Sequence, residues 1–143
     1  MGVSNVIEYV TMSSEGNATD FGDLAAARDN FGSCGNTTRG VFSGGFYVGL
    51  GTSGNVASNV IDYITIASTG NATDFGDLTS TRVLIFSTSN ATKAVCGRDG
   101  WIDGKNIDVV TIASTGNATD FGDLVTGLRG QVGACGGQGG LTA

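Results

Sequence analysis

The sequence contains no histidine among its 143 residues. Histidine is the commonest general base and metal ligand, so Ser-His-Asp, Cys-His and zinc–histidine sites cannot form within one chain. A GxxxxGK[ST] phosphate-binding loop is absent too. We therefore expect no catalytic residues, no enzyme activity and no cofactor. Because two carboxylates alone can hydrolyse glycosides, a carboxylate-dependent glycan hydrolase stays open as an alternative.

Positive charge and long apolar runs are also scarce. The chain has 7 Lys and Arg against 13 Asp and Glu, a net charge of −6. Nucleic-acid backbones attract the opposite sign, so we expect no nucleic-acid partner. No apolar run approaches the roughly 18 residues of a membrane span, so we expect no membrane insertion. The N-terminus lacks a basic segment followed by an apolar stretch, which argues against a secretory signal.

Glycine is abundant, with 25 residues, whereas proline is absent. The residues between the glycines are rich in Val, Ile, Thr, Phe and Tyr, which favour pleated, half-buried strands. The nine residues GNATDFGDL occur three times, starting at Gly16, Gly70 and Gly116. An unchanged block of this kind marks an array of one supersecondary unit. We predict one all-β repeat domain over 1–143, with units at about 1–54, 55–105 and 106–143.

Each unit divides into four short strands. The first reads SNVIEYVTM, SNVIDYITI or KNIDVVTI, in which apolar side chains alternate. One carboxylate interrupts each copy, and we expect it to lie in water at a strand end; these residues are Glu8, Asp62 and Asp108. A Gly-Asn turn follows. The next strand carries an aromatic residue as a buried structural anchor, namely Phe21, Phe75 and Phe121.

Units of about 50 residues with four strands are typical of propeller blades. The Gly44–Gly45 pair is expected to let two backbone segments approach closely. The order Gly44–Gly45, Tyr63, Gly70, Phe75, Leu78 and Arg82 resembles kelch-like propeller repeats, with Phe in place of the usual Trp. The wording IDYITIASTGNATDFGDL resembles the repeat of structural and tail-associated proteins of tailed phages that infect marine cyanobacteria. The resemblance covers nearly the whole chain. It implies a virion component, made in the host cytoplasm and exposed at a tail or fibre.

Counting strands in the propeller pattern gives two complete blades and a half-blade at each end. Half-blades leave unpaired strand edges, which favour association. Two chains placed head to tail would form a six-bladed homodimer, which we favour; the alternative is a monomeric three-sheet β-prism. Other virion proteins are further expected partners.

Arginine recurs at one position of each unit, as Arg28, Arg82 and Arg129. We expect these side chains to pair with Asp23, Asp77 and Asp123, or to hydrogen-bond carbonyl groups between blades; a ring of ligand-binding arginines is the alternative. The three cysteines lie far apart without a CxxC motif. We expect buried strand positions for them rather than a disulfide or a metal site. They are Cys34, Cys96 and Cys135.

Residues that break the repeat symmetry are the candidates for recognition. Phe46, Tyr47, Trp101 and Asp103 fall in segments that differ between units, which we interpret as loops. Aromatic rings beside a carboxylate commonly stack on sugars or anchor protein contacts, although Trp101 can equally pack its own loop. These residues are therefore the predicted contacts with a partner or a host surface glycan.

The repeated turns also carry oxygen ligands, at Asn17, Asp20 and Asp23 and at their equivalents in the other two units. Such a turn can hold Ca²⁺, but the spacing is not that of an EF-hand, and backbone capping explains the same residues. The predicted function is a phage virion protein that displays a propeller for attachment or protein–protein contact. A carbohydrate-binding lectin or adhesin of cellular origin is the alternative.

Overall fold

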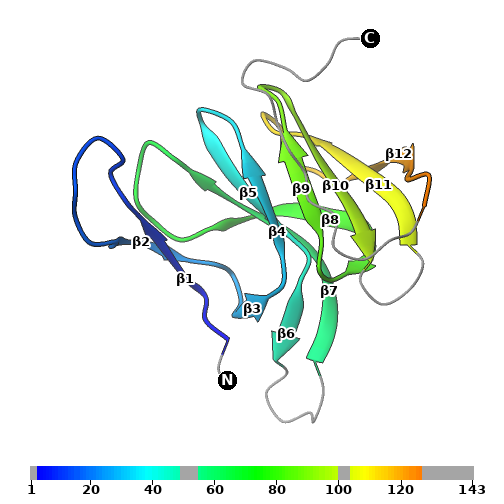
Figure 1. Cartoon of the computed structure of the whole chain (residues 1–143), viewed down its shortest axis with the longest axis horizontal. Coiled ribbons are helices and arrows are strands. Elements are labelled where there is room, and N and C mark those ends of the chain that lie inside the picture. Colours follow the sequence, from blue (N-terminus) through cyan, green and yellow to red (C-terminus); the bar gives the residue numbers. More distant parts are fainter. Residues whose placement is uncertain (1–2, 49–54, 100–103, 127–143) are drawn as a thin grey trace.

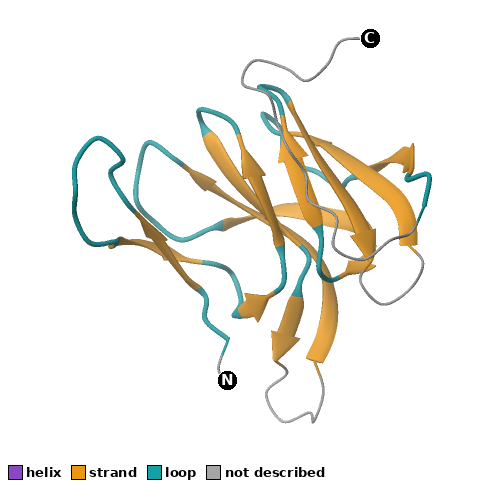
Figure 2. Cartoon of the chain, in the orientation of Figure 1, coloured by secondary structure: helices purple, strands orange, loops and turns teal. Residues whose placement is uncertain are grey.

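The computed structural model describes residues 3–48, 55–99 and 104–126, and these residues form strands, turns and loops with no helix (Figure 2). Accordingly, no helix suited to crossing a membrane occurs within those ranges. The predicted all-β class is confirmed. The strands are β1 (Val6–Tyr9), β2 (Thr19–Asp23), β3 (Arg28–Asp29), β4 (Gly32–Gly35), β5 (Arg39–Ser43), β6 (Phe46–Val48), β7 (Asn55–Thr65), β8 (Thr73–Arg82), β9 (Phe86–Ser89), β10 (Lys93–Asp99), β11 (Gly104–Thr111) and β12 (Thr119–Asp123).

The strands pair in the order expected for consecutive four-stranded units. The β1–β2 hairpin comes first, followed by β4–β5–β7–β8 and then by β9–β10–β11–β12, all antiparallel. β7 is long enough to serve two pairings, because its first residues also pair with β6, which in turn pairs with β3. Figure 1 shows the hairpin and β12 at opposite ends of the molecule. The last predicted half-unit falls in 127–143, outside the described residues.

The hydrophobic core lies between the two four-stranded sheets. Alternation along β7 places Ile61 and Asp62 on opposite faces, yet both side chains are fully buried, so each face of this strand is covered. Burying apolar side chains from both sheets supplies the main stabilising free energy. The buried core residues are Val41, Ile61, Phe75, Leu78, Ile85, Ala94, Cys96, Val110, Ile112 and Ala118.

The repeated phenylalanine is a buried anchor in two of the three units. Phe21 and Phe75 are 8% and 2% exposed, and each packs edge-on against a tyrosine of the preceding strand, Tyr9 or Tyr63. Phe121 is 64% exposed, so the prediction of a buried anchor is wrong there. In the third unit Val109 stands where a tyrosine packs against the other two rings, and among the described residues no turn docks on the Phe121 backbone.

The glycine pair after β5 permits the close approach that the sequence predicts. Gly44 has a φ of +63°, and a Cβ there would lie 2.8 Å from the carbonyl oxygen of Arg82. Gly45 donates its N–H to that same oxygen at 2.8 Å. Side chains at these positions would separate β5 and β8 at this crossing, so the pair ties the two strands together.

Candidate functional site

The repeated motif joins one unit to the next through its own backbone. In the second unit Gly70 donates its N–H to the Phe21 carbonyl at 2.7 Å, and Ala72 donates to the Asp23 carbonyl at 2.7 Å. In return, Asn71 accepts the N–H of Asp23 at 3.0 Å through its side-chain oxygen. The Gly-Asn-Ala turn of one unit therefore docks on the Phe-Gly-Asp edge strand of the unit before it.

The third unit docks on the second in the same way. Gly116 donates to the Phe75 carbonyl at 2.7 Å, and Ala118 donates to the Asp77 carbonyl at 2.8 Å. Asn117 accepts the N–H of Asp77 at 3.1 Å. Identical sequence thus gives the same three hydrogen bonds at both junctions. The motif of the second unit contacts the preceding unit through its first residues and the following unit through its last residues.

The central glycine of the edge strand is required for this docking. Gly22 and Gly76 have φ values of +146° and +141°, a region that side chains other than glycine rarely adopt. A Cβ on Gly22 would lie 2.4 Å from the Gly70 carbonyl, and one on Gly76 would lie 2.5 Å from the Gly116 carbonyl oxygen. Any other residue would push the docked turn away.

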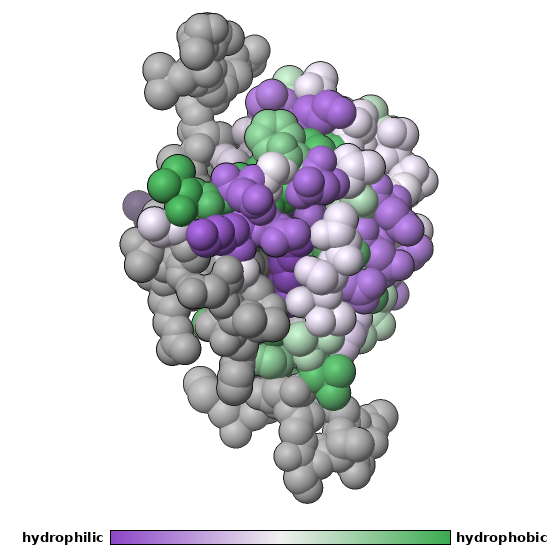
Figure 3. All heavy atoms as spheres, turned by 90° about the vertical axis from the view of Figure 1, so that its right-hand side faces the viewer, coloured by the Kyte–Doolittle hydropathy of each residue, from purple (hydrophilic) through white to green (hydrophobic). Residues whose placement is uncertain are grey.

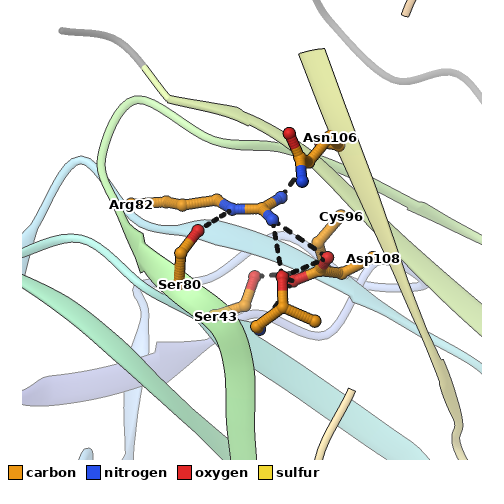
Figure 4. A network of polar contacts seen from close by, with 7 residues as sticks. Ser43, Ser80, Arg82, Cys96, Asn106 and Asp108 are labelled. Carbon is orange, nitrogen blue, oxygen red and sulfur yellow. Dashed lines mark hydrogen bonds and ion pairs between the residues drawn. The ribbon is translucent and has the colours of Figure 1, made fainter. Parts of the chain in front are cut away.

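A buried ion pair closes the second junction. Arg82 of the second unit reaches Asp108 of the third at 2.9 Å, and both side chains are at most 2% exposed. Figure 4 shows the guanidinium group extending toward Asp108 between the strands. The same guanidinium donates to the Asn106 carbonyl at 3.0 Å and to the Ser80 hydroxyl at 3.1 Å. Thr79 completes the network, since its hydroxyl accepts from Arg82 and donates to Asp108.

The first junction has the equivalent ion pair with fewer partners. Arg28 reaches Asp62 at 2.8 Å and also donates to the Val60 carbonyl at 3.2 Å. Arg28 Nε and Asp62 Oδ1 are buried without a hydrogen-bond partner. Burial raises the pKa of Asp62 above its ordinary value of 3.8, and this outweighs the lowering by Arg28 and by the backbone of Ala25.

These geometries correct two sequence-based expectations. The arginines pair with carboxylates of the following unit rather than with Asp23 or Asp77. Asp62 and Asp108 are accordingly buried rather than in water at a strand end, whereas Glu8 is exposed as expected. Hydrogen bonds to carbonyl groups are confirmed for Arg28 and Arg82; Arg129 lies outside the described residues. An Asp eight residues before the first glycine of the repeated motif, in the second and third units, was the signal available in the sequence.

A second buried polar cluster lies where β4, β5, β9 and β10 meet. Cys96 accepts hydrogen bonds from the Ser43 hydroxyl at 3.3 Å and from the Ser87 hydroxyl at 3.5 Å. A hydrogen bond from Cys34 lowers the pKa of Cys96 to about 7, against burial, which raises it. Cys96 is only 2% exposed and belongs to the hydrophobic core. Cys34 and Cys96 lie in β4 and β10; the predicted burial is confirmed for Cys96, whereas Cys34 is only partly buried. Cys135 is outside the described part.

The predicted recognition residues are only partly placed. Phe46 and Tyr47 lie in β6 and not in a loop, because the segment expected to be a long loop folds into a β6–β7 ribbon. Tyr47 lies opposite Val56, which is 55% exposed. The ribbon extends away from the four-stranded sheets (Figure 1). Trp101 and Asp103 fall outside the described residues, so the structure does not bring the four candidates together.

The repeated turns use their oxygen atoms within the protein. Asn71 and Asn117, which the sequence offers as calcium ligands, accept backbone N–H groups of the preceding unit instead. Within the described ranges, no group of three or more His, Cys, Asp or Glu side chains is placed to hold a metal ion. The bridging role of these asparagines was not predicted, although the invariance of the motif was a signal that its parts contact one another.

Comparison with protein-family models gives no match for this chain. A search of curated protein sequences gives no significant match either.

Proposed function

We propose that this chain is a non-catalytic structural protein of a phage virion, associated with the tail, whose sheets are blades of a kelch-like β-propeller. The observation that carries the proposal is the connector role of GNATDFGDL, which docks each unit on the one before it at both described junctions. Because the repeated residues join one sheet to the next, we infer that the chain forms a scaffold that presents a surface. The resemblance of the repeat to phage tail-associated proteins supplies the setting.

The polar chemistry of the described core supports a structural role. The buried charged side chains are two arginines and two aspartates, and all four are used in ion pairs between units. The buried thiol of Cys96 is enclosed by serine hydroxyls. Within the described residues, every buried charged side chain is therefore used to hold neighbouring units together.

The β6–β7 ribbon is the best candidate for contact with a partner. It has no counterpart in the second unit, since β10 and β11 pair directly through Asp99 and Gly104 at the equivalent place. It carries Tyr47 opposite the exposed Val56. An aromatic residue beside an exposed apolar residue suits stacking on a sugar ring or a protein surface. Several weak sites of this kind gain avidity when many units engage together.

Binding to cell envelopes and isolated surface polysaccharides of marine cyanobacteria tests this function. The expected result is retention of the 143-residue chain and at least tenfold weaker retention of Tyr47→Ala and Val56→Ser. Ile66→Ser is the matched control, because Ile66 is 46% exposed and follows the opposite end of β7, and it should bind as the unchanged chain does. If the chain binds to none of the envelope fractions, the proposed attachment role is wrong. Release of sugar from the polysaccharide would contradict the non-catalytic role.

A further inference from the structure

Each copy of the motif has two complementary faces. Its Gly-Asn-Ala turn offers two backbone N–H donors and one side-chain acceptor. Its Phe-Gly-Asp strand offers two carbonyl acceptors and one N–H donor. The two faces of the middle copy are both used, toward the first unit and toward the third. Among the described residues, the turn of the first copy and the edge strand of the third copy make no such contact.

The unused turn is at the N-terminal end. Among the described residues, no hydrogen bond joins Gly16, Asn17 or Ala18 to an edge strand. Ala18 is exposed, whereas its docked equivalent Ala118 is 9% exposed. The docked glycines Gly70 and Gly116 have φ values of +154° and +152°, whereas Gly16 is not in the positive region.

The unused edge is at the C-terminal end. Phe121 is 64% exposed, against 8% for Phe21 and 2% for Phe75 beneath their docked turns. Gly122 keeps the φ of +140° that docking requires, yet a Cβ there would meet no atom of the described residues within 4 Å. The acceptor strand is therefore already in its docking conformation and has an open space where the turn belongs.

The two unused faces point away from one another. The loop that contains the free turn and the free strand β12 lie at opposite ends of the long axis of the molecule (Figure 1). Figure 3 faces the β12 end and shows hydrophobic side chains interspersed among hydrophilic ones. Separated, complementary faces join copies head to tail. Addition of a backbone segment to an open sheet edge is an established mode of protein association.

We propose that the turn of one copy, Gly16–Ala18, docks on the β12 edge, Phe121–Asp123, of a second copy. Gly16 and Ala18 of one copy then donate to the Phe121 and Asp123 carbonyls of the other, and Asn17 accepts the N–H of Asp123. The second copy is the occupant that fits, because the same nine residues make this contact twice within the chain. The proposal rests on the blade arrangement proposed above and adds the residues that join its ends.

Two blocked variants test the contact. Ala18→Pro removes a required N–H donor from an exposed turn. Gly122→Ala places a Cβ in the space that the turn must enter, by analogy with the contact of 2.5 Å at Gly76. We expect the unchanged chain to sediment at a multiple of its 14.4 kDa mass and each variant alone to sediment as a monomer. An equimolar mixture should form a heterodimer with one copy of each, since one intact turn and one intact edge remain.

Milder variants and hydrogen exchange guard against misfolding of the blocked chains. Asn17→Ala keeps the backbone and should weaken association about tenfold, whereas Thr37→Ala, in an exposed turn elsewhere, should leave it unchanged. In the unchanged chain, amide protection at 16–18 should rise with protein concentration. A chain that stays monomeric at every concentration overturns the proposal, as does a mixture that stays monomeric. Mass and ligand binding are separate measurements, so failure of this contact is distinguishable from failure of the attachment function.

Discussion

The first and second junctions between units share their backbone contacts but differ in the surroundings of their ion pairs. At both, the turn docks with N–H···O distances of 2.7–2.8 Å. At the second junction, the hydroxyl groups of Thr79 and Ser80 hydrogen-bond to the Arg82–Asp108 ion pair. The first has Ala25 and Ala26 at those places and leaves two buried polar atoms without partners.

The difference separates two roles within the repeat. The invariant nine residues determine how units dock, since the docking uses backbone groups and the Asn side chain. The three residues before each arginine, Ala25–Ala27 or Thr79–Thr81, determine whether the buried ion pair is fully hydrogen-bonded. A buried ion pair offsets its desolvation only when its remaining donors and acceptors are satisfied. We therefore expect the second junction to contribute more to stability than the first.

The largest expected effect is the loss of an arginine. Arg82→Met leaves Asp108 buried and unpaired, and should lower the free energy of unfolding by about 3–5 kcal/mol. Arg28→Met should cost less, because the pKa of Asp62 is already raised and this carboxyl takes up a proton more readily. Urea unfolding of both variants measures the difference. Equal losses would mean that the hydroxyls around Arg82 are irrelevant to its ion pair.

The next effect concerns the hydroxyl that joins both partners of the second pair. Thr79→Ala removes hydrogen bonds to Arg82 and Asp108 and should cost about 1–3 kcal/mol of unfolding free energy. Thr81→Ala is the matched control two residues along the same strand, with an exposed side chain, and should change stability by less than about 0.5 kcal/mol. Similar losses in the two variants would contradict the network.

A smaller effect of opposite sign is expected at the first junction. The double variant Ala25→Thr with Ala26→Ser introduces the hydroxyls that the second junction has, within reach of the unpartnered Asp62 Oδ1 and Arg28 Nε. The gain should be about 1 kcal/mol in unfolding free energy, because each new bond satisfies a buried group. Thermal and urea unfolding measure it, and a net loss would show that the first junction has no room for these side chains.

The smallest effect is a dependence on pH. Since the pKa of Asp62 is raised in the folded protein, the native state binds a proton that the unfolded state has lost at pH values just above 3.8. Stability relative to Asp62→Asn should therefore fall as the pH rises through this window. In the double variant Ala25→Thr, Ala26→Ser, stability should decrease less with rising pH, since hydrogen bonds to the ionised Asp62 carboxylate lower the pKa of that group. If the stability of the unchanged chain relative to Asp62→Asn instead rises with pH, the pKa of Asp62 is not raised by folding.

Local pattern was sufficient for the fold class and for the first two strands of each unit. The alternation of Ile7 and Tyr9, or of Ile61 and Tyr63, is a property of neighbouring residues, and the strands β1 and β7 follow it. The Gly44–Gly45 pair likewise predicts a close backbone approach, because no other residue permits it.

The partners in the site could not be predicted from the same patterns. Arg28 and Asp62 are 34 residues apart, and Arg82 and Asp108 are 26 apart, so nothing local distinguishes Asp62 from Asp23 as a partner. Tyr47 was expected in a loop because its segment lacks a counterpart in the next unit, yet pairing with β7 makes it a strand. Such contacts are decided only when separate strands come together.

The sequence by itself determined that three identical motifs would adopt similar strands, since those strands follow from residue types and their spacing. Only the tertiary structure decided that the three Phe residues would differ, with Phe75 buried and Phe121 exposed. The physical reason is that a tyrosine and a docked turn lie beside Phe75, whereas Val109 replaces the tyrosine beside Phe121 and no turn docks there among the described residues. An identical peptide therefore has a different environment at the end of the array than in its middle.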